Sequence, residues 1–316
     1  MPDKWRGLYG IIGQIQRFVM DATEITTTLA TWQQDITLRA ENNLAARMKA
    51  LADVALAQEL VRLHGKREDW TAVAHQAALL QAELAAANGR LFQKIRQNIQ
   101  AGRYDPTTLR HLFNQFTGYT PEAAPPLHMG EDGLDLLLNG ILQVASLPEP
   151  MLAQTAEMVH LEVTPARAIL DMIDHVPIRP DDVFYDVGSG LGHVVILVAW
   201  LAGIQAKGVE IDPGYCQRAR QLGAELRVRN AHFIQGDART AAYHDGTIFF
   251  MFTPFTGQML HTVLSRLETE ARKRPITLCT YGTITLDVAQ QPWLQCLDRA
   301  RLHQFKLAIF QSGRCG

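Results

Sequence analysis

The sequence lacks long apolar runs and a charge of predominantly one sign. Its longest apolar run, residues 194–204, is far shorter than the roughly 20 residues that span a bilayer. Near the N-terminus, Gln14, Gln16 and Arg17 interrupt the apolar stretch, which is therefore not typical of a signal peptide. The formal net charge is −2, whereas general nucleic-acid binding needs a concentrated basic surface. We expect a cytoplasmic protein that binds neither membranes nor nucleic acid in general.

Cysteine is also scarce. The four thiols, Cys216, Cys279, Cys296 and Cys315, form no C-x-x-C pair, and no Cys/His cluster has the spacing of a zinc site. Scattered cysteines in a chain of 316 residues are typical of buried small apolar side chains in a reducing compartment. The sequence therefore predicts no metal site and no disulfide framework.

Residues 1–150 predict an α-helical N-terminal domain. Apolar side chains recur at helical spacing over residues 80–95, where the Asn88-Gly89 pair predicts an interruption. Asp105-Pro106 is a helix start, with an N-cap followed by proline at the first helical position. An earlier stripe at the same spacing consists of Leu44, Met48, Leu51, Leu56, Leu60 and Leu63.

The role of this N-terminal domain is open from the sequence. Its apolar stripes fit the core of a helical bundle, a lid over a substrate, or a dimerisation surface. A homodimer is thus one expected arrangement. No feature of residues 1–150 separates these three roles.

Residues 151–316 predict a second domain of α/β class. Short apolar strands alternate with helices and short loops, which indicates a mainly parallel sheet covered on both faces. Ligands of such sheets bind at the carboxyl ends of the strands. The expected strands are residues 183–187, 206–211, 232–235, 247–252 and 276–281, with a closing hairpin from 294–297 and 306–311.

A glycine-rich turn follows the first of these strands, where residues 186–192 read DVGSGLG. Glycine permits a tight turn and a close approach of the backbone to a ligand, and the next helix points its free amide groups at the same place. Asp186, two residues before the first glycine, can reach a positively charged group such as the amino group of a methionine moiety. A dinucleotide fingerprint would place its third glycine at residue 193, but here it is Gly192.

Two further acidic residues end the next two predicted strands. Glu210 lies about twenty residues after the glycines, where a carboxylate accepts both ribose hydroxyls, and Ile211 can pack on an adenine face. Asp237, followed by Ala238, is placed to accept a hydrogen bond from an adenine amino group. Three such sites at successive strand ends predict one nucleoside-binding edge.

These motifs resemble those of the class I S-adenosylmethionine-dependent methyltransferases, over roughly residues 162–312. The resemblance implies a Rossmann-like, seven-stranded sheet with an antiparallel last hairpin, and S-adenosylmethionine as the cofactor. Residues 162–164 (EVT), with DVGSGLGHVV and GVE downstream, resemble the cofactor motifs of the non-SET histone lysine methyltransferases. Glu162 or Thr164 would then lie near the methionine end of the cofactor. The candidate cofactor residues are Thr164, Asp186, Gly188, Ser189, Gly190, Gly192, Glu210, Ile211, Asp237, Ala238, Thr253 and Phe255.

The methyl acceptor is left open by the sequence. After the fourth predicted strand the chain reads Thr253-Pro254-Phe255, where the histone enzymes carry an asparagine pair followed by phenylalanine. Phe249, Phe250 and Phe252 are expected in the core. The acceptor is a small molecule or a protein on this reading, because kinship of fold does not fix the substrate.

A catalytic base is needed only if the acceptor must lose a proton before it attacks, because the sulfonium is already activated. The candidates are Tyr119 and His128 in a proline-rich loop, Glu162, His193 and Tyr281. The reading as a methyltransferase has two rivals. One is a non-catalytic module that binds S-adenosylmethionine, and the other is an NAD-type oxidoreductase, against which the position of Gly192 counts.

Overall fold

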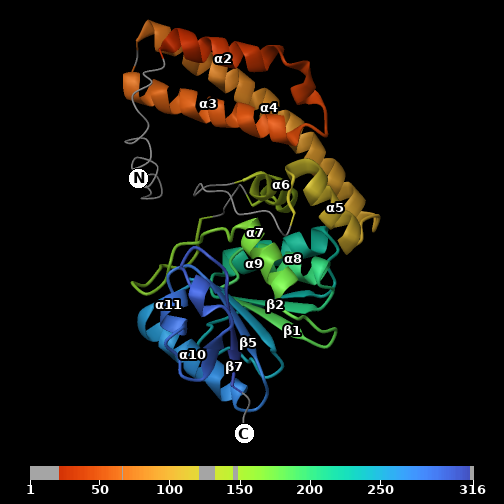
Figure 1. The fold of residues 1–316 in the computed structure, drawn as a ribbon, viewed down its shortest axis with the longest axis vertical. Helices are drawn as coiled ribbons and strands as arrows, with labels where there is room; N and C mark the ends of the chain where they lie inside the picture. Colours follow the sequence, from red (N-terminus) through yellow and green to blue (C-terminus); the bar gives the residue numbers. More distant parts are fainter. Residues whose placement is uncertain (1–20, 66, 121–131, 145–148, 314–316) are drawn as a thin grey trace. The chain divides into compact units, whose positions relative to one another are not determined.

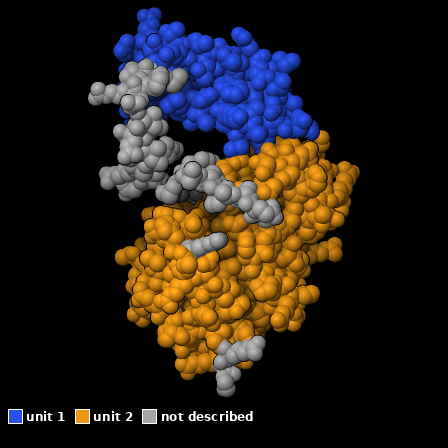
Figure 2. Space-filling view, in the orientation of Figure 1, with its two compact units in different colours: residues 1–90 blue, residues 91–316 orange. Residues whose placement is uncertain are grey.

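The computed structural model describes residues 21–65, 67–120, 132–144 and 149–313. The chain divides into two compact units, residues 1–90 and 91–316 (Figure 2). The sequence suggested a domain boundary at about residue 150. In the structure, the helices at residues 106–117 and 133–142 already belong to the unit that holds the sheet. Within the described residues, no helix is both long and apolar enough to cross a membrane.

The first unit is a set of packed helices (Figure 1). Asp21 begins it with a capping box, in which its side chain accepts from the backbone of Glu24 and the Glu24 side chain accepts from the backbone of Asp21. Ile25, Leu29 and Val54 lie in its buried apolar cluster. Its elements are α2 (Ala22–Gln34), η2 (Ile36–Arg39), α3 (Leu44–His64) and the first part of α4 (Glu68–Gln100).

The predicted interruption of the long helix at Asn88-Gly89 is wrong, because α4 is continuous through this pair. Asn88 is buried, and its Oδ1 accepts a hydrogen bond from Nε of Arg47, 2.6 Å away. Arg47 is itself fully buried and donates to the backbone carbonyls of Leu38 and Ala40. A tertiary contact thus offsets the weak helix propensity of the pair.

The stripe proposed for α3 is also wrong in part. Leu56 and Leu63 are 42% and 60% exposed. The buried face carries smaller side chains and the arginine at the same helical spacing, and it consists of Leu44, Arg47, Ala50, Val54 and Ala57. Small residues allow α3 to approach its neighbours closely. Close packing, and not hydrophobicity alone, therefore determines which face of α3 is buried.

The second unit contains a seven-stranded sheet, as the resemblance implied, and its strand order is β3-β2-β1-β4-β5-β7-β6. The pairs from β3 to β5 are parallel, whereas β7 runs antiparallel to both β5 and β6. The strands are β1 (Val183–Val187), β2 (Gln205–Glu210), β3 (Ala231–Gln235), β4 (Ile248–Phe252), β5 (Thr277–Tyr281), β6 (Leu294–Cys296) and β7 (Ala308–Ser312).

Helices cover both faces of this sheet (Figure 1). On one side, α8 packs on β1 and β2 and α9 packs on β2 and β3, with α7 beside α8. Two earlier helices, α5 and α6, pack against α8 and α7. The helices are α5 (Pro106–Thr117), α6 (Gly133–Leu142), α7 (Ala166–His175), α8 (His193–Leu201), α9 (Pro213–Glu225), α10 (Gly257–Ala271), α11 (Thr285–Val288) and η3 (Arg299–Arg301).

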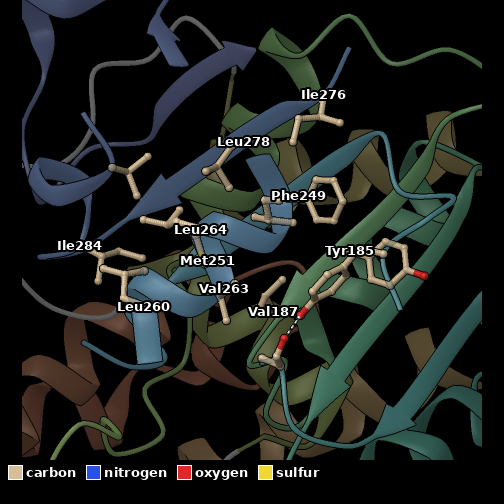
Figure 3. Packing of buried hydrophobic residues seen from close by; sticks show 14 of the residues in the cluster. Tyr185, Val187, Phe249, Met251, Leu260, Val263, Leu264, Ile276, Leu278 and Ile284 are labelled. Atoms are coloured by element: carbon tan, nitrogen blue, oxygen red, sulfur yellow. Dashed lines mark hydrogen bonds between the residues drawn. The ribbon is translucent and has the colours of Figure 1, made fainter. Parts of the chain in front are cut away.

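The opposite face packs against α10 and α11 (Figure 3). Leu260 and Val263 of α10 lie in one buried cluster with Tyr185 of β1, Phe249 of β4 and Leu278 of β5. Side chains from three adjacent strands therefore fix the ends of β1 and β4 relative to each other. The candidate site is built at those ends.

Candidate active site

The glycine-rich turn after β1 needs its glycines. Gly188, Gly190 and Gly192 have φ of +84°, +50° and +76°, values that glycine adopts without strain. The amides of Gly188 and Ser189 both donate to the carbonyl of Val209 in β2, which holds the turn against the sheet. A Cβ atom at Gly188 would lie 2.2 Å from Cβ of Pro254. The turn is therefore pressed between the ends of β2 and β4.

Gly192 is expected to be costly to replace, because an added Cβ atom would contact two neighbouring side chains. A Cβ atom there would lie 2.3 Å from Cε1 of Phe233 and 2.9 Å from Cβ of Ala219. We expect Gly192→Ala to lower the free energy of unfolding by about 2–5 kcal/mol, the sum of left-handed backbone strain and overpacking. The matched control is Gly203→Ala, because Gly203 has φ of +72° but no atom within 4 Å of an added Cβ. Urea unfolding measures both, and an equal loss in the two variants would contradict the packing argument.

Asp186 is the penultimate residue of β1 and is 3% exposed. Burial, together with the nearby Glu210 carboxylate, raises the pKa of Asp186 to about 8. The unliganded protein therefore holds this carboxyl largely protonated at neutral pH. A cation bound beside it would favour the charged form.

Glu210 joins the glycine turn to the end of β2. Its Oε2 accepts from the amide of Gly190 at 2.8 Å, and its Oε1 accepts from the amide of Asp212 at 2.8 Å. Burial raises the pKa of Glu210, while these two amides act in the opposite direction. Each oxygen keeps a second lone pair for a ligand.

Asp237, after β3, is paired with Arg239. Both carboxylate oxygens accept from the guanidinium, with Nη2 to Oδ2 at 2.6 Å. Hydrogen bonds from Arg239 lower the pKa of Asp237. The carboxylate is therefore charged and held in a fixed orientation, with lone pairs remaining on both oxygens.

A pocket brings most of the sequence-derived candidates together at the carboxyl edge of β1, β2, β3 and β4. Gly190 and Gly192 are not among its lining residues and act through the shape of the turn. The candidates that line the pocket are Glu162, Thr164, Asp186, Gly188, Ser189, His193, Glu210, Ile211, Asp237, Ala238, Thr253 and Phe255.

Sequence reasoning missed one whole wall of the pocket. Residues 150–164, which we call the strap, precede α7 in mostly irregular backbone, and they supply Leu152, Met158 and Leu161 to the lining. The strap matches no motif apart from its last three residues, so periodicity offered no signal for it. Phe252, expected in the core, is only partly buried and also lines the pocket.

The remaining catalytic candidates lie away from this lining. Tyr281 is half-buried at the end of β5, with its ring 5.2 Å from that of Phe252 in edge-to-face packing. Tyr119 is buried, with the Arg167 guanidinium over its ring and no hydrogen-bond partner for its hydroxyl. Burial raises the pKa of both phenols, so they stay protonated at neutral pH and are not available to accept a proton. His128 lies outside the described residues.

Residues 153–245 match the family model of the histone methylation protein DOT1. This segment contains the strap from residue 153 onward, the glycine turn, Glu210 and Asp237, whereas the pocket residues at the end of β4 follow it. The chain carries a class I S-adenosylmethionine-dependent methyltransferase domain. Its cofactor is S-adenosylmethionine.

The sheet is similar in fold to several solved methyltransferases. An RNA methyltransferase from Salinibacter ruber in complex with S-adenosyl-L-homocysteine is 22% identical, with a TM-score of 0.36, and the match covers 48% of this chain and 92% of that one. Precorrin-6y C5,15-methyltransferase from Geobacter metallireducens is 16% identical, with a TM-score of 0.37 and coverage of 52% and 94%. A methyltransferase from Thiobacillus denitrificans with S-adenosyl-L-homocysteine is 18% identical, with a TM-score of 0.31 and coverage of 39% and 51%.

Two buried polar atoms of the methyltransferase pocket fit a polar ligand, because neither has a protein partner. They are Oγ of Ser189 and Nδ1 of His193. Nε2 of His193 accepts from the amide of Thr164 at 3.0 Å, and burial lowers the pKa of His193 to about 4. The neutral ring then carries its proton on Nδ1 and offers it as a donor. With its second nitrogen already an acceptor, His193 is poorly suited to act as a base.

The charge of the pocket fits the cofactor as well. Its lining includes Glu162, Asp186, Glu210, Asp212 and Asp237, and none of the described lining residues is a lysine or an arginine. S-adenosylmethionine carries an ammonium and a sulfonium against one carboxylate, so carboxylates on the wall stabilise its net positive charge electrostatically. When bound, the cofactor supplies an activated methyl group. Asp186 would orient the ammonium, and Glu210 would accept from the ribose.

Proposed function

We propose that this methyltransferase transfers the methyl group of S-adenosylmethionine to an amine nitrogen of a protein or small-molecule acceptor. The observation that carries the proposal is the set of carboxylates on the pocket wall with no described lysine or arginine among them. Such a wall attracts cationic groups and repels phosphates. The name of the matching family, histone methylation protein, makes a lysine side chain the first acceptor to test.

The acceptor would enter at the end of β4. Phe252, Thr253, Pro254 and Phe255 follow one another there and all line the pocket. Thr253 has φ of +39°, an unfavourable value for a β-branched residue, and strain of this kind concentrates at functional sites. Aromatic rings also suit a cationic amine, because a ring face attracts positive charge.

The reaction is a displacement that balances without a further reactant. The nitrogen lone pair forms a bond to the methyl carbon while the carbon–sulfur bond breaks, and its electrons go to sulfur to give S-adenosylhomocysteine. An ammonium acceptor must first lose a proton. Glu162 lines the pocket and is exposed, so in this proposal its carboxylate passes that proton to water. The chain's main contribution is to hold the reactants in line.

The test follows the methyl label to its acceptor. Purified protein is incubated with methyl-labelled S-adenosylmethionine and, separately, a lysine-rich protein, an RNA and a set of small amines. We expect label on nitrogen of the protein or the amines, with formation of S-adenosylhomocysteine. At a cofactor concentration below the wild-type Kd, Asp186→Asn should lower both signals by about 10- to 100-fold. Label on RNA, oxygen or carbon would refute the amine proposal. Binding of the cofactor without turnover in any cell extract would favour a non-catalytic module.

A further inference from the structure

The strap, residues 150–164, is held in place by hydrogen bonds at the ends of two strands. At its start, the amides of Met151 and Leu152 donate to Oδ2 of Asp212, at 2.7 and 2.8 Å. Asp212 follows β2 and is 4% exposed. Its Oδ1 accepts from the amides of Gly214 and Tyr215 and so caps α9. One carboxylate thus caps a helix with one oxygen and holds the strap with the other.

The middle of the strap is held at the end of β4. Glu157 belongs to the strap, and its carboxylate accepts from the first amides of α10, those of Gln258 and Met259, at 2.8 and 3.0 Å. The amide of Val159 donates to the carbonyl of Pro254 at 3.1 Å. The strap therefore spans two helix N-termini, each of which attracts a carboxylate.

The same contacts connect the strap to the residues expected to hold the cofactor. The amide of Asp212 donates to Glu210, whose other oxygen accepts from Gly190. Leu161 of the strap lies against Gly190, because a Cβ atom there would come within 2.4 Å of the leucine Cδ1. Near its end, the amide of Thr164 donates to His193. The strap and the Glu210 carboxylate, which is expected to bind the ribose, therefore belong to one hydrogen-bonded network.

We propose that Asp212 and Glu157 are positioning residues that hold the strap as a wall of the cofactor pocket and thereby slow release of the cofactor. A helix cap needs only one oxygen, and serine supplies it. The second oxygen of Asp212 accepts only from the strap among the described hydrogen bonds. This inference rests on the proposed function only in taking S-adenosylhomocysteine as the probe ligand.

The experiment compares Asp212→Ser with the wild-type protein by hydrogen exchange of the free protein and by the dissociation rate of S-adenosylhomocysteine. Serine keeps the cap of α9 and removes the oxygen that holds the strap. We expect amide protection to fall in residues 151–156 while β1 and β2 keep theirs. The ligand should dissociate about tenfold faster, with a matching rise in Kd. The matched control is Asp105→Ser, which changes the cap of α5, where Asp105 accepts from Thr108. It should leave both measurements unchanged.

The proposal would be overturned if a folded Asp212→Ser variant exchanged its strap amides and released the ligand at wild-type rates. It would also be overturned if protection fell equally throughout β1 and β2. If Asp212→Ser does not fold, Glu157→Ala makes the equivalent change from the strap side, and residues 156–161 should then lose protection. A wild-type protein that binds no S-adenosylhomocysteine would refute the proposed function instead. The exchange experiment needs no ligand and would still decide the role of the strap.

Discussion

Asp186→Asn is expected to stabilise the protein at pH 8 while it removes most of the affinity for the cofactor. Burial raises the pKa of Asp186 to about 8, far above the value near 4 of an unfolded chain. Between these values the folded state binds more protons than the unfolded state, so the free energy of unfolding falls as pH rises. The slope is at most about 1.4 kcal/mol per pH unit. Asparagine has no proton to lose, so the variant's advantage grows from pH 5 to pH 8.

The affinity for the cofactor is expected to change with pH in the opposite direction to the stability. An ammonium beside Asp186 favours the carboxylate, so wild-type affinity for S-adenosylhomocysteine should rise from pH 6 to pH 8. Loss of this charge-assisted hydrogen bond in Asp186→Asn costs about 1.5–3 kcal/mol, or about 10- to 100-fold in Kd. Urea unfolding and calorimetric titration at pH 6, 7 and 8 measure both effects. Asp287→Asn, at an exposed carboxylate on α11, is the control and should change neither. A variant that binds as tightly as wild type at pH 8 would contradict the assignment.

Glu210→Ala is expected to lose S-adenosylhomocysteine binding almost completely. The change removes the carboxylate expected to accept from two ribose hydroxyls, and it also leaves the amides of Gly190 and Asp212 without their present partner. At about 1.5–3 kcal/mol for each hydrogen bond to a charged group, the affinity should fall by at least about 100-fold. Calorimetric titration with S-adenosylhomocysteine measures the fall, and parallel titration with NADH tests the oxidoreductase alternative.

Two variants separate this effect from a general loss of structure. Glu210→Gln keeps one acceptor oxygen and should bind more tightly than the alanine variant. Glu268→Ala removes a carboxylate of α10 that pairs with Arg272 on the exposed side of that helix, and it should bind like wild type. A folded Glu210→Ala protein with a Kd within threefold of wild type would show that the ribose does not contact Glu210.

The sheet and its cofactor motifs could be predicted because they depend on short-range patterns. The strands from Val183 to Tyr281 are short segments that alternate with helices, and the structure has every one of them within two residues of the expected ends. Glycines at positions 188, 190 and 192 indicated a tight turn, and in the structure all three have positive φ. A motif of this kind specifies both a backbone conformation and a place at a strand end.

Other features depended on contacts between distant parts of the chain. The continuity of α4 at Asn88 depends on Arg47, and the identity of the buried face of α3 depends on which side chains allow close packing. Neither follows from helix propensity or periodicity, because both act only over neighbouring residues. The use of Phe252 in the pocket rather than the core has the same cause, since it is fixed by what surrounds the end of β4.

The sequence by itself determined the fold class, the order of strands and helices, and the carboxylates at the ends of β1, β2 and β3. Only the tertiary structure decided that the strap forms the remaining wall, because Asp212 and Glu157 join segments 61 and 101 residues apart in the chain. It also decided that Asp186 is largely protonated and His193 neutral in the free protein, because burial sets both pKa values. Residue type gives a group its chemistry, but its environment in the folded chain sets the charge that it carries.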